Sequence, residues 1–138
     1  MLKIAICDDE ESYLELISFK IKRAIQDQIG MGFEIERYSS IDDLYEQIKI
    51  GKADIVFLDI MVNDINSVNW LVDHQHEFSN MSFIIMTGYP TETENLSEID
   101  CCYYLLKSKM TDEQLLRAIK RSINAVTKEK TNLETVSY

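Results

Sequence analysis

Five short β-type segments alternate with helical patterns along this 138-residue chain, and this alternation limits the folds available to it. The runs IAI, IVFL and FII are apolar at consecutive positions, so both faces of those strands need a covering layer. Parallel strands joined by right-handed crossover helices meet that need. We therefore predict an α/β fold, with a doubly wound five-stranded parallel sheet and helices on both faces. The predicted strands are Lys3–Cys7, Phe33–Tyr38, Asp54–Leu58, Ser82–Met86 and Tyr103–Leu106.

The segments between the strands carry apolar residues at helical spacing, flanked by capping residues and glycines. The most regular pattern covers residues 13–25 and is followed by Gly30 and Gly32. The fourth pattern is acidic and has few apolar anchors, so we expect a short, weakly held helix there. The other predicted helices run from a Ser39 or Ser40 cap to Gly51, over Ser67–Phe78, between Thr91 and Ile99, and from Thr111 to Val126.

Composition and charge narrow the function further. The chain has 24 acidic and 14 basic residues, a formal net charge of −10, so electrostatics oppose direct binding to nucleic acid or anionic lipid. No apolar stretch approaches the roughly 20 residues that span a bilayer. The three cysteines are odd in number and lack C-x-x-C spacing, which is typical of reduced thiols. We expect one domain, located in the cytoplasm, that binds neither DNA nor membrane directly.

Polar side chains follow four of the predicted strands. Asp8 and Asp9 come after the first strand, Asp59 after the third, Thr87 after the fourth and Lys107 after the fifth. In doubly wound sheets, ligands bind beyond the carboxyl ends of the strands. Carboxylates gathered there repel one another and require positive charge nearby. Three carboxylates and one lysine would be neutralised by a divalent cation, and hard oxygen ligands favour magnesium (Mg²⁺).

Such a site suits phosphoryl chemistry. One carboxylate could attack a phosphoryl group whose oxygens contact the metal, Lys107 and the Thr87 hydroxyl. We assign the attack to Asp59, which ends the expected central strand, and metal binding to Asp8 and Asp9, which precede a helix. Taken one by one, each residue also has a purely structural interpretation, as a helix cap, a loop acid, a turn hydroxyl or a solvated strand end.

The five positions together resemble the receiver domain of two-component response regulators, over residues 2 to about 127. The opening IAICDDE and the later YYLLKS are most similar to receivers of LytTR-type regulators. The resemblance implies a flavodoxin-like strand order 2-1-3-4-5 and Asp59 as the phospho-acceptor. It also implies magnesium held by Asp8, Asp9, Asp59 and the Met61 backbone carbonyl, phosphoryl oxygens held by Thr87 and Lys107, and a Tyr104 side chain that changes rotamer with Thr87.

By the same resemblance, a sensor histidine kinase donates the phosphoryl group, and the receiver catalyses its own modification without being a turnover enzyme. Phosphorylation would switch the fifth strand and its flanking helices to control an output, expected to be transcription. The resemblance also allows a homodimer through the fourth helix, fifth strand and fifth helix. We expect residues 1–127 to form the receiver and residues 128–138 a helix end or linker, which could lead to an output domain. Met61 and Tyr89 lack a group that orients water, so we expect slow self-dephosphorylation.

The chain departs from the family pattern at three positions. Asn63 stands where proline is usual and Ser67 where glycine is usual, so we expect a less rigid loop. Asn63 and Asn66 can still tolerate turn conformations, so the site need not collapse. Ser108 replaces the proline that follows the lysine, whose preceding peptide bond is cis in the family. A cis bond before a non-proline residue costs roughly 2.5–4 kcal/mol. We therefore expect a strained cis Lys107–Ser108 bond or a displaced lysine.

Three alternatives remain at this stage. The chain could be a stand-alone phosphorelay receiver, or a pseudo-receiver that acts only as a protein-interaction module. A phosphatase of haloacid-dehalogenase type would use the same aspartate nucleophile. That class needs a D-x-D motif. Asp59 is followed by Ile60 and Met61, so the second aspartate of the motif is absent here.

Overall fold

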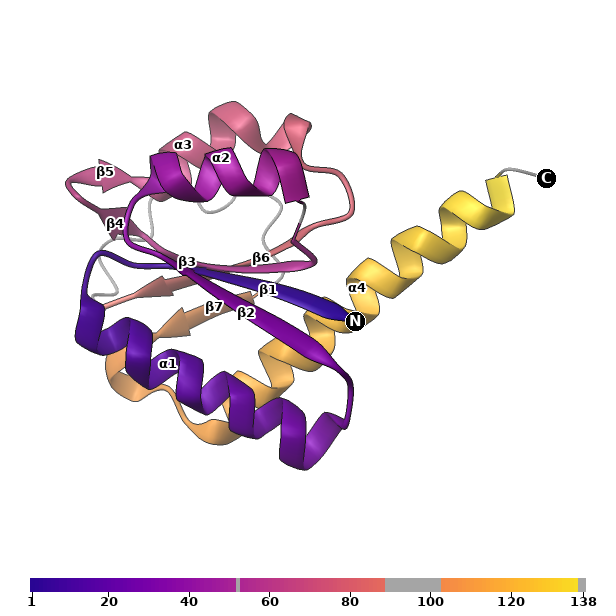
Figure 1. The fold of residues 1–138 in the computed structure, drawn as a ribbon, viewed down its shortest axis with the longest axis horizontal. Helices are drawn as coiled ribbons and strands as arrows, with labels where there is room; N and C mark the ends of the chain where they lie inside the picture. The colour runs from indigo at the N-terminus through magenta and orange to yellow at the C-terminus, as the bar shows by residue number, and fades with distance from the viewer. Residues whose placement is uncertain (52, 89–102, 137–138) are drawn as a thin grey trace.

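The structure, a computed structural model, describes residues 1–51, 53–88 and 103–136, with side chains described as far as Val126. Its centre is a five-stranded sheet in the order β2-β1-β3-β6-β7, and every neighbouring pair is parallel. The predicted doubly wound sheet with flavodoxin-like order is confirmed (Figure 1). The strands are β1 Leu2–Cys7, β2 Phe33–Tyr38, β3 Ile55–Asp59, β6 Ser82–Thr87 and β7 Tyr103–Leu106.

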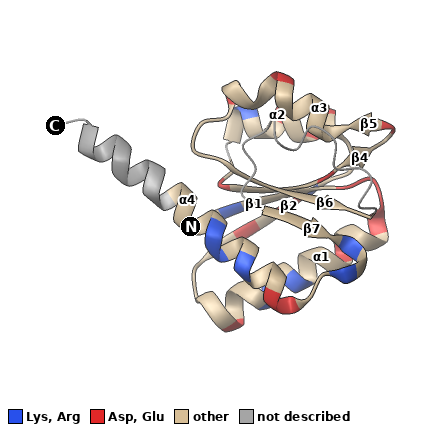
Figure 2. Cartoon of the chain, turned by 180° about the vertical axis from the view of Figure 1, so that it is seen from behind, with Lys and Arg blue, Asp and Glu red and all other residues tan. Residues whose placement is uncertain are grey.

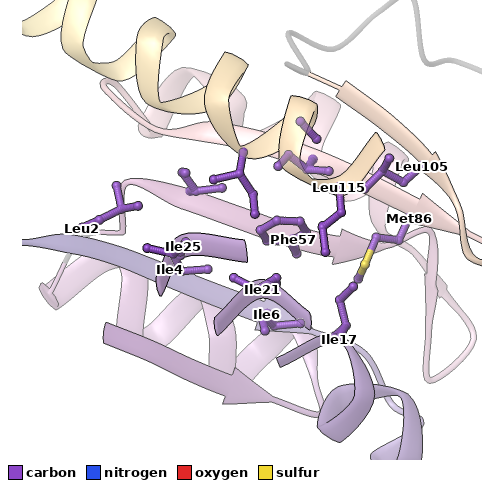
Figure 3. Close-up of a cluster of buried hydrophobic side chains, with 14 of the residues drawn as sticks. Leu2, Ile4, Ile6, Ile17, Ile21, Ile25, Phe57, Met86, Leu105 and Leu115 are labelled. Atoms are coloured by element: carbon purple, nitrogen blue, oxygen red, sulfur yellow. The ribbon is translucent and has the colours of Figure 1, made fainter. Parts of the chain in front are cut away.

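Helices cover both faces of this sheet (Figure 1). Helices α1 (Glu11–Ala24) and α4 (Asp112–Val136) pack on one face, and α2 (Ile41–Gly51) and α3 (Ser67–His74) pack on the other. The α1–α4 side buries a cluster built around Ile21 and Phe57, shown in Figure 3. The three inner strands are buried along nearly their whole length, which explains why their apolar residues do not alternate with polar ones.

Local sequence signals fix the helix ends. The Ser40 side chain accepts a hydrogen bond from the Asp43 backbone N–H at 3.1 Å, so Ser40 rather than Ser39 caps α2. Thr111 and Gln114 form a reciprocal capping box at the start of α4, with two bonds of 3.1 Å. After α1 the chain makes one π-helical turn, Ile25–Ile29, and leaves it through Gly30 at φ 76°, a conformation that glycine adopts without steric cost.

Some details differ from the sequence predictions. The third helix is regular only to His74 and continues as a 3₁₀ turn, η2 (Gln75–Glu77). A small antiparallel hairpin of β4 (Met61–Val62) and β5 (Ile65–Asn66), which we did not predict, follows β3. The fourth predicted helix, between Thr91 and Ile99, lies outside the described residues. Over the described ranges, no helix combines the length and apolar character needed to cross a bilayer.

The register of the strands aligns their carboxyl ends. Cys7 pairs with Leu58 across β1 and β3, so the residues that follow in each strand, Asp8 and Asp59, lie side by side. Asp59 in turn pairs with Met86 of β6. The sheet therefore brings the polar strand ends of the sequence to one edge.

Candidate functional site

Three carboxylates from two adjacent strands converge at this edge. Asp8 and Asp9 follow β1 and Asp59 ends β3, and one carboxylate oxygen of each lies within 4.8 Å of the others. Asp8 is fully buried and Asp59 is 7% exposed, whereas Asp9 is exposed. Charged residues are visible along the loops at this end of the sheet in Figure 2. The convergence that the sequence predicted is therefore present.

The buried Asp8 carboxylate uses both of its oxygens. Its Oδ1 accepts a hydrogen bond from the Glu10 backbone N–H at 2.9 Å, just before α1 begins. Its Oδ2 accepts one from the Lys107 ammonium at 2.5 Å. Asp8 thus orders the entrance to α1 and also holds the lysine, so its structural and functional interpretations are compatible.

Lys107 joins the two buried carboxylates. Its Nζ lies 3.3 Å from Asp59 Oδ2, and its side chain is 14% exposed. Our expectation of a cis Lys107–Ser108 bond or a displaced lysine is wrong, because no cis peptide bond occurs among the described residues and the ammonium still reaches Asp59. The trans bond avoids the cost of a non-proline cis bond, and the 3₁₀ turn η5 (Lys107–Lys109) carries the chain away after β7.

The electrostatics of the pocket show an excess of negative charge. Burial and then the Asp8 carboxylate raise the pKa of Asp59 from 3.8 to about 7, although Lys107 acts in the opposite direction. Burial by itself would lower the pKa of Lys107, but the hydrogen bond to Asp8 and the charge of Asp59 outweigh it and raise that pKa. One ammonium therefore does not neutralise the three carboxylates, and the site favours a further cation.

The donor set suits magnesium. All three side chains offer hard carboxylate oxygens, the ligand type that Mg²⁺ prefers, and Asp9 is open to solvent. Met61, whose backbone carbonyl we predict as a further ligand, begins β4 two residues after Asp59. The residues present therefore fit the metal that the sequence predicted.

The loop after Asp59 is held by the residues that depart from the family pattern. Asn63 and Asp64 occupy the hairpin turn at φ 49° and 66°, and the Asn63 N–H donates to Asp9 Oδ2 at 2.9 Å. The fully buried Ser67 donates its hydroxyl to the Asp59 backbone carbonyl at 2.5 Å. Asn66 caps α3, accepting from the Asn69 N–H at 3.0 Å. Asn63 and Ser67 thus add hydrogen bonds to this loop, and its lower rigidity stays a prediction.

The predicted switch residues lie on neighbouring strands and share a face of the sheet, because Tyr104 pairs with Ile85 and Thr87 is two residues further along β6. Thr87 is fully buried at the end of β6, one residue past Met86, the partner of Asp59. Tyr104 is half-buried in β7 and packs against the core beneath α2 and α3. Tyr89, the second residue predicted to influence phosphoryl lifetime, lies outside the described residues. The roles of Thr87 and Tyr104 stay predictions.

Sequence analysis missed Tyr13 as a site residue. Its ring lies on the first turn of α1, and the Lys107 Nζ sits 4.3 Å from the ring centroid. The helical spacing of Tyr13 indicated only a core position, and it does contact the α1–α4 core. A signal was present nonetheless: Tyr13 follows Asp9 by four residues and therefore starts its helix at the same sheet edge.

Comparison with known proteins identifies the architecture. A response regulator receiver domain protein from Clostridium thermocellum is 24% identical, with a TM-score of 0.73, over 91% of this chain and 96% of that one. A CheY-like receiver domain protein from Methanospirillum hungatei JF-1 is 21% identical, with a TM-score of 0.74, over 94% of this chain and 98% of that one. At these identities the likeness establishes the fold.

Sequence comparison also finds a relative that is a signalling protein. The sensory transduction protein LytT of Bacillus anthracis is 26% identical over 122 residues, covering 88% of this chain. The chain spans about half the length of that relative, 47%. No family model matches the sequence.

Proposed function

We propose that this chain, whose fold is that of response-regulator receiver domains, is a phospho-accepting receiver most similar to those of LytTR-type regulators. A sensor histidine kinase would donate the phosphoryl group, and Asp59 would accept it. The observation that carries the proposal is the buried pocket in which Lys107 Nζ lies between Asp8 Oδ2 and Asp59 Oδ2, at 2.5 and 3.3 Å. An ordinary strand end does not bury two carboxylates around one lysine, because desolvation penalises both charges.

The chemistry follows from the positions of these side chains. An Asp59 carboxylate oxygen attacks the phosphorus of a phosphohistidine, a P–O bond forms, the P–N bond breaks, and the electron pair stays with the leaving imidazole. Lys107 neutralises charge on the phosphoryl oxygens, and Thr87 at the end of β6 offers a hydroxyl to one of them. Mg²⁺, held by Asp8, Asp9, Asp59 and the Met61 carbonyl, would neutralise the rest of the negative charge. Asp59 must be ionised to attack, so a second cation also serves by lowering its raised pKa.

Phosphorylation would then act on the surface around β7. A phosphoryl group adds nearly two negative charges next to Lys107, and Thr87 and Tyr104 are the proposed responding side chains. The output, proposed to be transcription, would belong to a further domain, since the chain spans about half of its LytT relatives. Residues 1–127 would be the receiver and 128–138 the start of a connection, with dimerisation through the β7 and α4 face. A cytoplasmic location and the absence of turnover follow from this role.

The decisive experiment measures covalent phosphorylation of the chain. After incubation with phosphoramidate and Mg²⁺, we expect mass spectrometry to show one added phosphoryl group. We expect no added group when Mg²⁺ is omitted, and none in Asp59→Asn. Asp64→Asn is the matched control, because Asp64 is an exposed carboxylate on the adjacent hairpin turn. It should phosphorylate like the wild type. Uptake that persists in Asp59→Asn would contradict the assignment, and no uptake at all would favour an interaction module.

A further inference from the structure

We propose that Tyr13 is a positioning residue for Lys107, and that its aromatic ring holds the ammonium in register with Asp8 and Asp59. The inference rests on the proposed phospho-accepting function. It adds a residue from α1 to a site otherwise built from strand ends. The geometry that carries it is a single ammonium with three neighbours, two carboxylates and one ring.

The distances place the ring in direct contact with the lysine head group. Lys107 Nζ lies 4.3 Å from the Tyr13 ring centroid, within the roughly 6 Å over which a cation is attracted by an aromatic face. The side chain of Lys107 is only 14% exposed, so water screens this contact weakly. Tyr13 itself is half-buried against the α1–α4 core, which fixes the ring before any ligand binds.

Among the described residues, the ring is a third restraint on the lysine head group, beside the two carboxylates. Lysine carries a compact charge on a flexible four-carbon stem, and ion pairing alone leaves its direction poorly defined. The residue after Lys107 is Ser108, which is exposed and does not restrict the backbone as a proline ring would. Tyr13 is carried by α1, and Asp8 orders the start of that helix. The same carboxylate therefore positions the ring and the ammonium.

The phenol hydroxyl is not the acting group. Burial, together with the Asp8 and Asp59 charges, raises the pKa of Tyr13, so the side chain stays neutral. A neutral ring attracts the lysine through its face and does not compete with the carboxylates for it. Phenylalanine should therefore replace tyrosine at this position, whereas an aliphatic side chain of similar size should not.

The test compares Tyr13→Phe with Tyr13→Leu in the full chain. We expect Tyr13→Leu to slow Mg²⁺-dependent phosphoryl uptake from phosphoramidate by about fivefold, the factor that corresponds to roughly 1 kcal/mol of cation–π attraction. Tyr13→Phe should restore the wild-type rate. Phe19→Leu is the matched control, because it removes an exposed ring from the same helix. The Phe19 ring contacts Arg23, whose Cζ lies 5.8 Å from the ring centroid, and not the lysine of the site. It should phosphorylate at the wild-type rate.

A second readout separates positioning from general stability. In ¹³C–¹H spectra, the Lys107 ε-methylene protons should show an upfield ring-current shift in the wild type and Tyr13→Phe, and lose it in Tyr13→Leu. Tyr13→Met replaces Tyr13→Leu if the latter lowers the melting temperature. Equal uptake rates in Tyr13→Leu and the wild type would overturn the inference while leaving the proposed function intact. A wild-type chain that takes up no phosphoryl group would overturn both.

Discussion

Two clusters of polar and charged side chains in this protein have similar shortest hydrogen-bond distances but differ in their exposure to solvent. In the buried acidic pocket, defined by Asp8, Asp59 and Lys107, the shortest contact is 2.5 Å and the exposed fractions of the paired side chains are 0% and 14%. In the α2–α3 surface cluster, defined by Tyr45, His74 and Glu77, both contacts to Glu77 are 2.6 Å, and the His74 and Glu77 side chains are 32% and 35% exposed.

The comparison shows that burial changes the protonation of a carboxylate that has a charged or hydrogen-bonding neighbour. In the surface cluster, hydrogen bonds from Tyr45 and then His74 lower the pKa of Glu77, as expected where water supports the charge. In the pocket, burial raises the pKa of Asp59 to about 7 despite a lysine within 3.3 Å. For Asp59, burial and the Asp8 charge outweigh the lysine, whereas for Lys107 the two carboxylates outweigh burial. The pocket is the region where the chain keeps charge at a cost in stability.

The largest predicted effect comes from removing Lys107, the one cation of the buried acidic pocket among the residues that the structure describes. Lys107→Met leaves Asp8 and Asp59 facing each other without compensation, so we expect a loss of about 3–5 kcal/mol in the free energy of unfolding. Urea denaturation measures it. The matched control is Arg117→Met, which breaks an exposed 3.0 Å ion pair with Glu113 and should change stability by at most ~0.5 kcal/mol. Similar losses in the two variants would remove the distinction between the clusters.

The next effect should be a gain. Asp59→Asn removes the carboxylate whose pKa rises from 3.8 unfolded to about 7 folded, so the metal-free variant should be more stable by between roughly 1 and 4 kcal/mol at pH 8. Because the folded wild type binds more protons than the unfolded chain between those pKa values, its stability falls as pH rises through that window. The advantage of the variant should therefore be smaller at pH 5 than at pH 8.

Two controls sharpen this prediction. Asp64→Asn, at an exposed turn position, should show no gain that grows with pH. Added Mg²⁺ should raise the melting temperature of the wild type and have less effect on Asp59→Asn, because binding to the folded state stabilises it. A gain in Asp59→Asn that is larger at pH 5 than at pH 8 would contradict the sign of the pKa shift.

The smallest effect should come from the α2–α3 surface cluster. Glu77→Gln keeps a hydrogen-bonding side chain beside Tyr45 and His74 and removes only a charge that water already supports. We expect its urea midpoint to match the wild type within error at low and high salt. A midpoint shift comparable to that of Lys107→Met would show that the surface cluster is also a site of stored electrostatic energy.

Sequence reasoning succeeded where a pattern repeats over several residues. The strands and their parallel pairing follow from apolar runs with no polar face. The predicted cap at Ser39 or Ser40 and the predicted start at Thr111 are confirmed, with Ser40 as the cap. Sequence reasoning was less successful where the role of a single side chain depends on its neighbours in the fold. For Trp70 the sequence does not distinguish packing from a partner contact, whereas in the structure its ring centroid lies 5.7 Å from that of Tyr45 and 5.8 Å from that of Phe78, which indicates packing.

The error at the site has a physical origin. We expected the serine after Lys107 to force a cis bond or move the lysine, and this compared one residue with a family pattern without its neighbours in the fold. Neighbours distant in sequence also contact the loop after Asp59, whose rigidity stays a prediction. Ser67 donates a hydrogen bond to the Asp59 carbonyl and Asn63 donates one to Asp9, and neither partner is adjacent in sequence.

The sequence by itself determined the layered α/β fold and the gathering of Asp8, Asp9, Asp59 and Lys107 at one edge, because strand ends are set by local apolar periodicity and parallel pairing aligns them. Only the tertiary structure decided how charge is distributed there. The depth of Asp8, the raised pKa of Asp59 and the ring of Tyr13 beneath Lys107 depend on desolvation and on distances between segments far apart in the chain. Those quantities exist only once the layers have packed.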